Sequence, residues 1–145
     1  MIKDDYDFDY LIIGSGFGGS VSAHRLSEKG YSVAVMEMGK RWEAKDFPKT
    51  NWNTPKWIWR PAINFFGFFN LRIFRHVAII CGNAVGGGSI TYANTLLVPP
   101  DSVWSEGTWG KIPHLKEDMP QYFAEAERML GVTDNKIFGP ADHML

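Results

Sequence analysis

The sequence predicts an α/β fold with a parallel β-sheet, because two apolar runs flank a helical pattern near its beginning. Residues 10–13 (YLII) form a short, continuous run, which is typical of a central strand buried on both faces. Residues 18–29 have helical spacing, and Gly30 follows as a helix-ending glycine. Residues 32–36 form the second run. These elements predict a βαβ unit over residues 7–37, and since such crossovers are nearly always right-handed, its strands should be parallel neighbours.

The composition is that of one globular domain and gives no electrostatic reason to expect nucleic-acid binding. Hydrophobic residues make up 45% of the 145 residues, charged residues 21%, and the formal net charge is −1. Cys81 is the single cysteine, and the four histidines show no metal-ligand spacing. The sequence lacks a signal-peptide pattern, and no stretch reaches the ~20 apolar residues of a membrane-spanning helix. We therefore expect a cytoplasmic protein without a metal, with peripheral membrane contact left open.

A glycine motif connects the first predicted strand to the helix. Residues 14–19 (GSGFGG) have the pattern G-x-G-x-x-G. In this pattern Gly14 permits the tight turn, Gly16 lets a pyrophosphate approach the backbone, and Gly19 lets the helix pack closely. Glu37 follows the second strand, where an acidic side chain accepts hydrogen bonds from the adenosine ribose. This context predicts a dinucleotide site, although the motif alone does not separate FAD from NAD.

A second glycine motif follows another apolar run. Residues 77–81 (VAIIC) read as a strand, and residues 82–89 (GNAVGGGS) follow it directly. Consecutive glycines let the backbone lie against a flat ligand or a phosphate, and their N–H groups can form an anion-binding nest. Ser89 and Asn94 could add polar contacts. Because apolar segments lie on both sides of this motif, we expect it to be ordered.

The two glycine motifs together resemble those of the glucose–methanol–choline (GMC) family of FAD-dependent oxidoreductases, and in particular its bacterial cholesterol oxidase-like members. The resemblance rests on residues 12–21 (IIGSGFGGSV), 36–42 (MEMGKRW), 85–89 (VGGGS), 92–96 (YANTL), 99–100 (PP) and 128–132 (RMLGV). It implies that the fold is a Rossmann-like FAD/NAD(P)-binding domain of which this chain is an incomplete, N-terminal portion. The cofactor implied is FAD.

The resemblance also implies which residues bind the cofactor. The first motif would face the FAD pyrophosphate, Glu37 the ribose, and the second motif the pyrophosphate–flavin end. Many family members have an asparagine three residues after the motif serine, where this chain has Tyr92, and Asn94 comes two residues later, so the flavin contact is open between them. The candidate cofactor-binding residues are Gly14, Ser15, Gly16, Phe17, Gly18, Gly19, Glu37, Met38, Gly86, Gly87, Gly88, Ser89, Tyr92 and Asn94.

The family's activity gives the functional expectation. GMC enzymes oxidise an alcohol CH–OH group by hydride transfer to flavin, and a sterol 3β-hydroxyl is the favoured substrate here, with oxygen or another electron acceptor. The family's catalytic base lies near the C-terminus of a much longer chain, so no catalytic residue is assigned, and the 145 residues alone should be inactive and bind FAD poorly. The alternatives are a GMC dehydrogenase for another alcohol and a non-catalytic truncated FAD-binding fragment.

Residues from about 40 to 76 form an aromatic and basic insertion. Ten aromatic residues and eight of the 15 Lys and Arg residues lie within residues 40–80, against two acidic residues. Because three prolines interrupt it, we expect short helical turns and loops. The favoured interpretation is that the aromatic rings fill a core and cover the cofactor; a sterol-entry surface and a membrane-interface patch are the alternatives. After the second cofactor loop, taken as residues 82–95, a last helix is expected at about 117–131.

Overall fold

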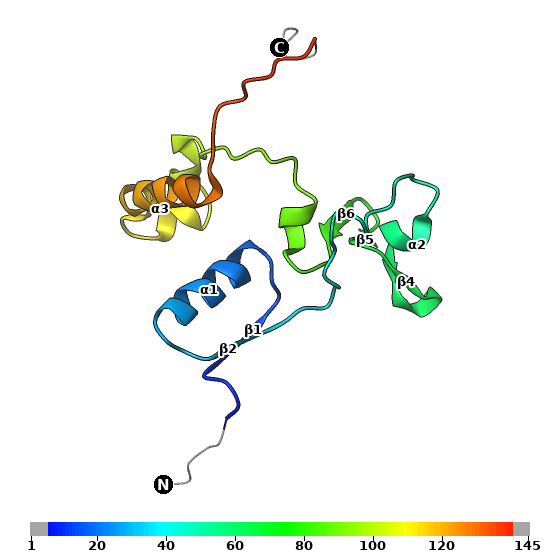
Figure 1. Cartoon of the computed structure of the whole chain (residues 1–145). Helices are drawn as coiled ribbons and strands as arrows, with labels where there is room; N and C mark the ends of the chain where they lie inside the picture. The colour runs from blue at the N-terminus through cyan, green and yellow to red at the C-terminus, as the bar shows by residue number, and fades with distance from the viewer. Residues whose placement is uncertain (1–5, 141–145) are drawn as a thin grey trace. The chain divides into compact units, whose positions relative to one another are not determined.

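The computed structural model describes residues 6–140, and the chain divides into two units, residues 1–93 and 94–145. All six strands of the described residues lie in the first unit, together with helices α1 (Phe17–Glu28) and α2 (Thr54–Trp57) (Figure 1). Helix α3 (Leu115–Leu130) lies in the second unit. The two glycine motifs and Glu37 therefore belong to one unit.

The predicted βαβ unit is confirmed. Strand β1 (Tyr10–Ile13), helix α1 (Phe17–Glu28) and strand β2 (Val33–Met36) follow one another, and β1 pairs with β2 in parallel. Gly30 ends the helix as expected: it has a φ of +88°, and its N–H donates to the carbonyl oxygen of Ser27 at 2.9 Å. The N–H of Tyr31 donates to the carbonyl oxygen of Leu26 at 3.2 Å, which completes a Schellman motif.

The β1–β2 sheet is two-stranded among the described residues, and much of its apolar surface is uncovered. Leu11 is 59% exposed and Ile13 is 87% exposed. Parallel sheets normally have both faces covered, so these strands are those of an incomplete sheet. This agrees with the expectation that the chain carries only part of a Rossmann-like domain.

The insertion contains more β-structure than predicted. Helix α2 (Thr54–Trp57) and a 3₁₀ turn at Pro61–Ile63 fit the expected helical turns. Strand β3 (Trp59–Arg60), however, pairs antiparallel with β4 (Phe65–Phe66), and β5 (Phe69–Ile73) pairs antiparallel with β6 (Ala78–Gly82). The prediction of helical turns and loops was wrong for β3, β4 and β5, whereas β6 had been predicted as a strand. The apolar–polar alternation of residues 69–73 (FNLRI) is the sequence signal for strand β5. Its pairing partner is β6.

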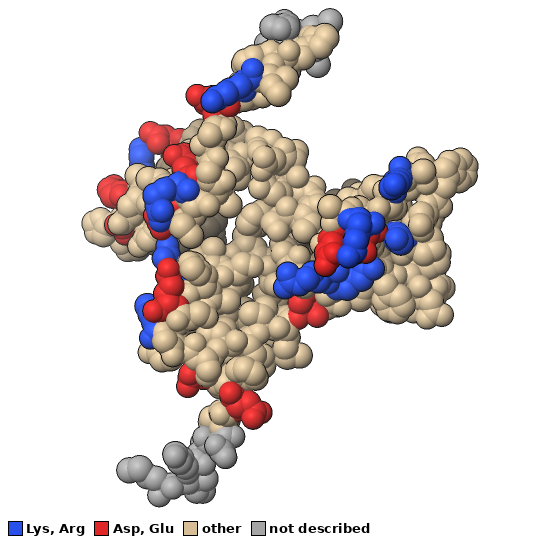
Figure 2. Space-filling view, viewed as in Figure 1, with Lys and Arg blue, Asp and Glu red and all other residues tan. Residues whose placement is uncertain are grey.

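Aromatic rings form the core of the insertion. Phe68 is 4% exposed, and its ring centroid lies 5.2, 5.2, 5.1 and 4.7 Å from those of Trp42, Phe47, Trp57 and Phe69. The ammonium of Lys40 lies 3.9 Å from the centroid of the Trp42 ring, a cation–π contact. Figure 2 shows Lys and Arg side chains on the surface near α2, β5 and β6. The core interpretation is therefore confirmed for Phe68.

The second unit contains one long helix. Helix α3 (Leu115–Leu130) begins two residues before the predicted start and ends at Gly131, whose φ is +65°. Pro120 lies inside this helix, and two 3₁₀ turns, Asp101–Ser105 and Trp109–Lys111, precede it. In residues 6–140 no helix is long and apolar enough to cross a membrane.

Candidate dinucleotide-binding site

The first glycine motif turns sharply from β1 into α1. Gly14 has a φ of +93°, and its N–H donates to the carbonyl oxygen of Met36 at 2.7 Å. A Cβ at Gly19 would overlap the carbonyl oxygen of Gly14 and lie 3.3 Å from Cγ2 of Ile12, so this glycine permits the close helix packing that was predicted. A Cβ at Gly16 or Gly18 would meet no atom within 4 Å. The outer side of the turn is thus open at the N-terminus of α1. A helix N-terminus favours a phosphate there, because its N–H groups are free and its dipole is positive.

Glu37 lies beside this turn. Its Oε2 accepts hydrogen bonds from the N–H of Ser15 at 2.9 Å and from the Ser15 hydroxyl at 2.7 Å, and its Oε1 accepts from the N–H of Gly39 at 2.9 Å. Partial burial by itself raises the pKa of this carboxyl, but the hydrogen bonds from Gly39, Ser15 and Met38 outweigh it, so the pKa is lower than that of an ordinary glutamate. Glu37 is therefore an ionised acceptor next to the first motif.

The second glycine motif contacts the first. The N–H of Gly86 donates to the hydroxyl oxygen of Ser15 at 2.9 Å. A Cβ at Gly87 would lie 3.0 Å from Cα of Gly16, and one at Gly88 would lie 3.6 Å from Cε2 of Phe17. The structure thus brings together two motifs that lie about seventy residues apart in the sequence, and a 3₁₀ turn, Gly87–Ile90, directly follows the hydrogen-bonded Gly86.

Gly39, which sequence reasoning did not single out, makes this approach possible. A Cβ there would lie 2.5 Å from Cα of Ala84 and would overlap the backbone of Asn83. Ala84 is fully buried, and the N–H of Val85 donates to the carbonyl oxygen of Lys40 at 3.1 Å. The segment after β2 and the segment after β6 therefore pack backbone to backbone. The sequence signal for this residue was a glycine three residues after the end of β2.

Of the remaining candidate residues, Tyr92 contacts the first glycine motif, Asn94 belongs to the second unit, and Met38 and Ser89 are exposed. The ring of Tyr92 lies edge-on to that of Phe17, with centroids 5.5 Å apart, so Tyr92 is beside the glycine motifs. Asn94 belongs to the second unit and is not among the residues that the first unit brings together. Met38 is 58% exposed, and Ser89 is exposed with its N–H donating to the carbonyl oxygen of Gly86 at 3.0 Å.

None of the described histidines belongs to the two glycine motifs. His24, on α1, is 3.2 Å from the carboxylate of Glu28; His76 lies between β5 and β6, and His114 precedes α3. All three are exposed, and His143 lies outside the described residues. Within residues 6–140, no group of three His, Cys, Asp or Glu side chains could hold a metal ion.

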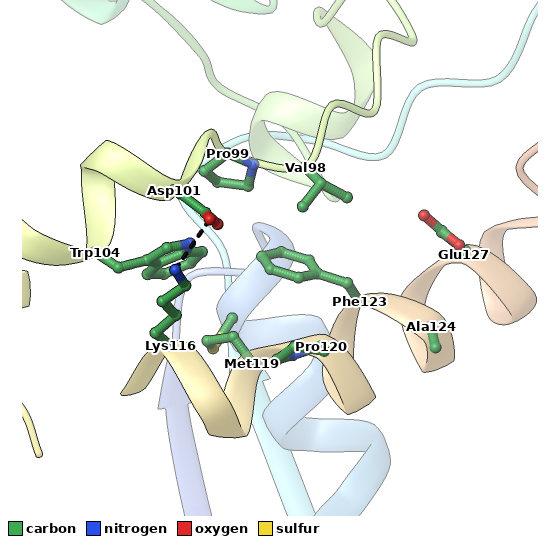
Figure 3. Close-up of a pocket in the computed structure, with 10 residues that line it drawn as sticks. All are labelled: Val98, Pro99, Asp101, Trp104, Lys116, Met119, Pro120, Phe123, Ala124 and Glu127. Atoms are coloured by element: carbon green, nitrogen blue, oxygen red, sulfur yellow. Dashed lines mark hydrogen bonds and ion pairs between the residues drawn. The ribbon is translucent and has the colours of Figure 1, made fainter. Parts of the chain in front are cut away.

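The second unit contains a cavity of about 330 Å³ between α3 and the 3₁₀ turn Asp101–Ser105 (Figure 3). Apolar side chains such as Trp104 and Phe123 line it, and the Asp101–Lys116 ion pair, at 3.0 Å, lies at its edge. None of the candidate cofactor residues lines this cavity. It is therefore distinct from the candidate dinucleotide site.

Comparisons with known proteins agree with this geometry. Residues 12–44 match the family model of an NAD(P)-binding Rossmann-like domain. The chain is 75% identical to a cholesterol oxidase of Acinetobacter baumannii over 145 residues, which are 100% of this chain and 26% of that protein. It is 45% identical to a cholesterol oxidase of Mycobacterium tuberculosis over 139 residues, 96% of this chain and 24% of that protein. An uncharacterized GMC-type oxidoreductase of M. tuberculosis is 28% identical over 97 residues, 63% of this chain and 14% of that protein.

Fold, site and family model together define a Rossmann-like dinucleotide-binding chain, as the sequence predicts. The chain is similar to the N-terminal part of two cholesterol oxidases and, at lower identity, to a GMC-type oxidoreductase. It spans about a quarter of the length of the cholesterol oxidases that it matches.

Proposed function

We propose that this chain binds FAD as the N-terminal part of a GMC-type oxidoreductase that oxidises an alcohol, with the 3β-hydroxyl of a sterol as the favoured substrate. One observation carries the proposal: two relatives named cholesterol oxidase match 100% and 96% of the chain, at 75% and 45% identity. Their names supply the substrate class. A role in sterol or lipid metabolism follows from it.

The residues present fit the two ends of a dinucleotide. The open side of Gly16 and Gly18 has room for a pyrophosphate, and Gly16, the N-cap of α1, has no side chain to occupy the N–H groups of the first turn. Glu37 offers an ionised carboxylate for ribose hydroxyls, which would disfavour a 2′-phosphate. We assign the flavin end to Gly86, Gly87, Gly88 and Ser89, with Tyr92 and Asn94 as the candidate polar contacts.

In this proposal the chain binds and orients the cofactor but does not supply the base. Bound FAD would accept the hydride that leaves the alcohol carbon. We assign the base to another part of a longer polypeptide, because the chain spans about a quarter of the cholesterol oxidases that it matches. The electron acceptor would be oxygen or another oxidant.

A chimera tests the proposal. Residues 1–145 would replace the matching 26% of the A. baumannii cholesterol oxidase. The purified chimera should show a flavin absorbance band at about one FAD per chain and release hydrogen peroxide with cholesterol. A chimera that is folded, by circular dichroism and gel filtration, yet free of flavin would contradict FAD binding. A chimera that holds FAD but releases no hydrogen peroxide with cholesterol would contradict only the sterol assignment, because this chain would then not support sterol oxidation.

A further inference from the structure

The Ser15 side chain lies at the junction of all three segments of the candidate site. Ser15 is 7% exposed, although the outer side of the motif around it is open. Its hydroxyl donates to Oε2 of Glu37 at 2.7 Å and accepts the N–H of Gly86 at 2.9 Å. Its carbonyl oxygen accepts the hydroxyl of Ser20 at 2.7 Å. The side chain of Ser15, which belongs to the first glycine motif, therefore contacts both Glu37, directly after β2, and Gly86 of the second motif.

The direction of these hydrogen bonds is fixed by chemistry. A serine hydroxyl has one proton to donate, an ionised carboxylate only accepts, and a backbone N–H only donates. The proton of Ser15 must then point to Glu37, and the Gly86 N–H must point to Ser15. The result is a directed chain from Gly86 through Ser15 to Glu37, in which each hydrogen bond polarises the next.

We propose that Ser15 is a positioning residue that sets the ribose-binding Glu37 and the second glycine motif in place together, rather than a residue that touches the cofactor. The role of Ser15 in cofactor binding rests on the proposed FAD site. The hydrogen bonds from Gly86 to Ser15 and from Ser15 to Glu37 do not depend on that proposal. Without the hydroxyl, Gly86 loses its acceptor and Glu37 loses one donor in a partly buried site. The hydrogen-bonded link between Glu37 and Gly86 would then be lost, and the backbone packing at Gly39 and Lys40 would have to hold the two segments together without it.

Nuclear magnetic resonance on the 145-residue chain tests the hydrogen-bond chain without any cofactor. In the wild type, the chemical shift of the Gly86 amide proton should change as the Glu37 carboxyl is protonated. Ser15→Ala should abolish this pH dependence, and it should speed hydrogen exchange of the Gly86 amide about tenfold or more. Ser15→Thr, which keeps a hydroxyl, should restore both signals. Ser27→Ala, an exposed serine-to-alanine change on α1, is the matched control and should leave both as in the wild type.

A second measurement reports the functional consequence. In the chimera described above, Ser15→Ala should weaken FAD binding about ten- to a hundredfold, with recovery in Ser15→Thr. A wild-type Gly86 amide that ignores the Glu37 titration would overturn the inference, and so would identical spectra for wild type and Ser15→Ala. If Ser15→Ala fails to fold, the wild-type titration and Ser15→Thr still decide. An intact hydrogen-bond chain in a protein that binds no FAD would overturn the proposed function alone.

Discussion

Alanine at the adjacent glycines of the first motif should have opposite effects on stability. At Gly19, the added methyl group would overlap the carbonyl oxygen of Gly14 and lie 3.1 Å from its carbonyl carbon. Backbone atoms cannot rotate away, so α1 must move from the β1 turn, at a cost of about 1–3 kcal/mol. At Gly18 the methyl group would meet no atom within 4 Å, and alanine in a helix should stabilise by up to about 1 kcal/mol.

Urea unfolding of the 145-residue chain, followed by tryptophan fluorescence, gives the assay. Gly19→Ala should lower the urea midpoint and Gly18→Ala should hold or raise it, with no change in the slope of either transition. Both measurements are made without FAD, so that the proximity of Gly18 to the proposed pyrophosphate site plays no part. Equal midpoints for the two variants would refute the close packing of α1 on the turn.

Three other features of the structure lead to predictions. Phe68→Ala should destabilise the chain by about 3–5 kcal/mol, because the buried ring leaves a cavity, whereas Phe66→Ala, at a residue 48% exposed, should cost far less; similar losses would contradict the aromatic core. Because the folded state lowers the pKa of Glu37, the stability that it contributes is present above the ordinary glutamate pKa of about 4.3 and disappears as pH falls through the lowered value. The urea midpoints of the wild type and Glu37→Gln should thus converge in acid, and a constant gap would count against this. For the membrane-interface alternative, Trp52, 89% exposed, and Phe74, 55% exposed, are better test sites than the buried Phe68: changing both to serine should reduce co-sedimentation with anionic vesicles, and unchanged binding would exclude it for these side chains.

The βαβ unit was predictable because its signals are local. A continuous apolar run, a G-x-G-x-x-G turn and a helix that ends at Gly30 each act over a few residues, and the structure has all of them in the expected places. The end of α3 was predictable for the same reason, since Gly131 takes the left-handed conformation that stops a helix.

The hairpin of β5 and β6 was missed because the aromatic residues hid its pattern. Phe65, Phe66, Phe68 and Phe69 read as an apolar cluster without a period, and only residues 69–73 alternate clearly. The contact between the glycine motifs could not be derived from spacing either. This contact depends on Ser15 and Gly39, which matter because segments distant in the sequence pack against them in the fold. The sequence shows that Gly39 is a glycine, but it does not show which backbone segment packs against it.

We propose that both glycine motifs and Glu37 form one FAD-binding surface. Titration of the ¹⁵N-labelled chain with FAD, followed by amide shifts, tests it most directly, because this method detects even the weak binding expected of an incomplete domain. We expect the amides of residues 14–19 and of residues 86–89 to shift together and to saturate at one FAD concentration, whereas ADP should shift mainly the amides of residues 14–19. Shifts confined to one motif, or to neither, would contradict it.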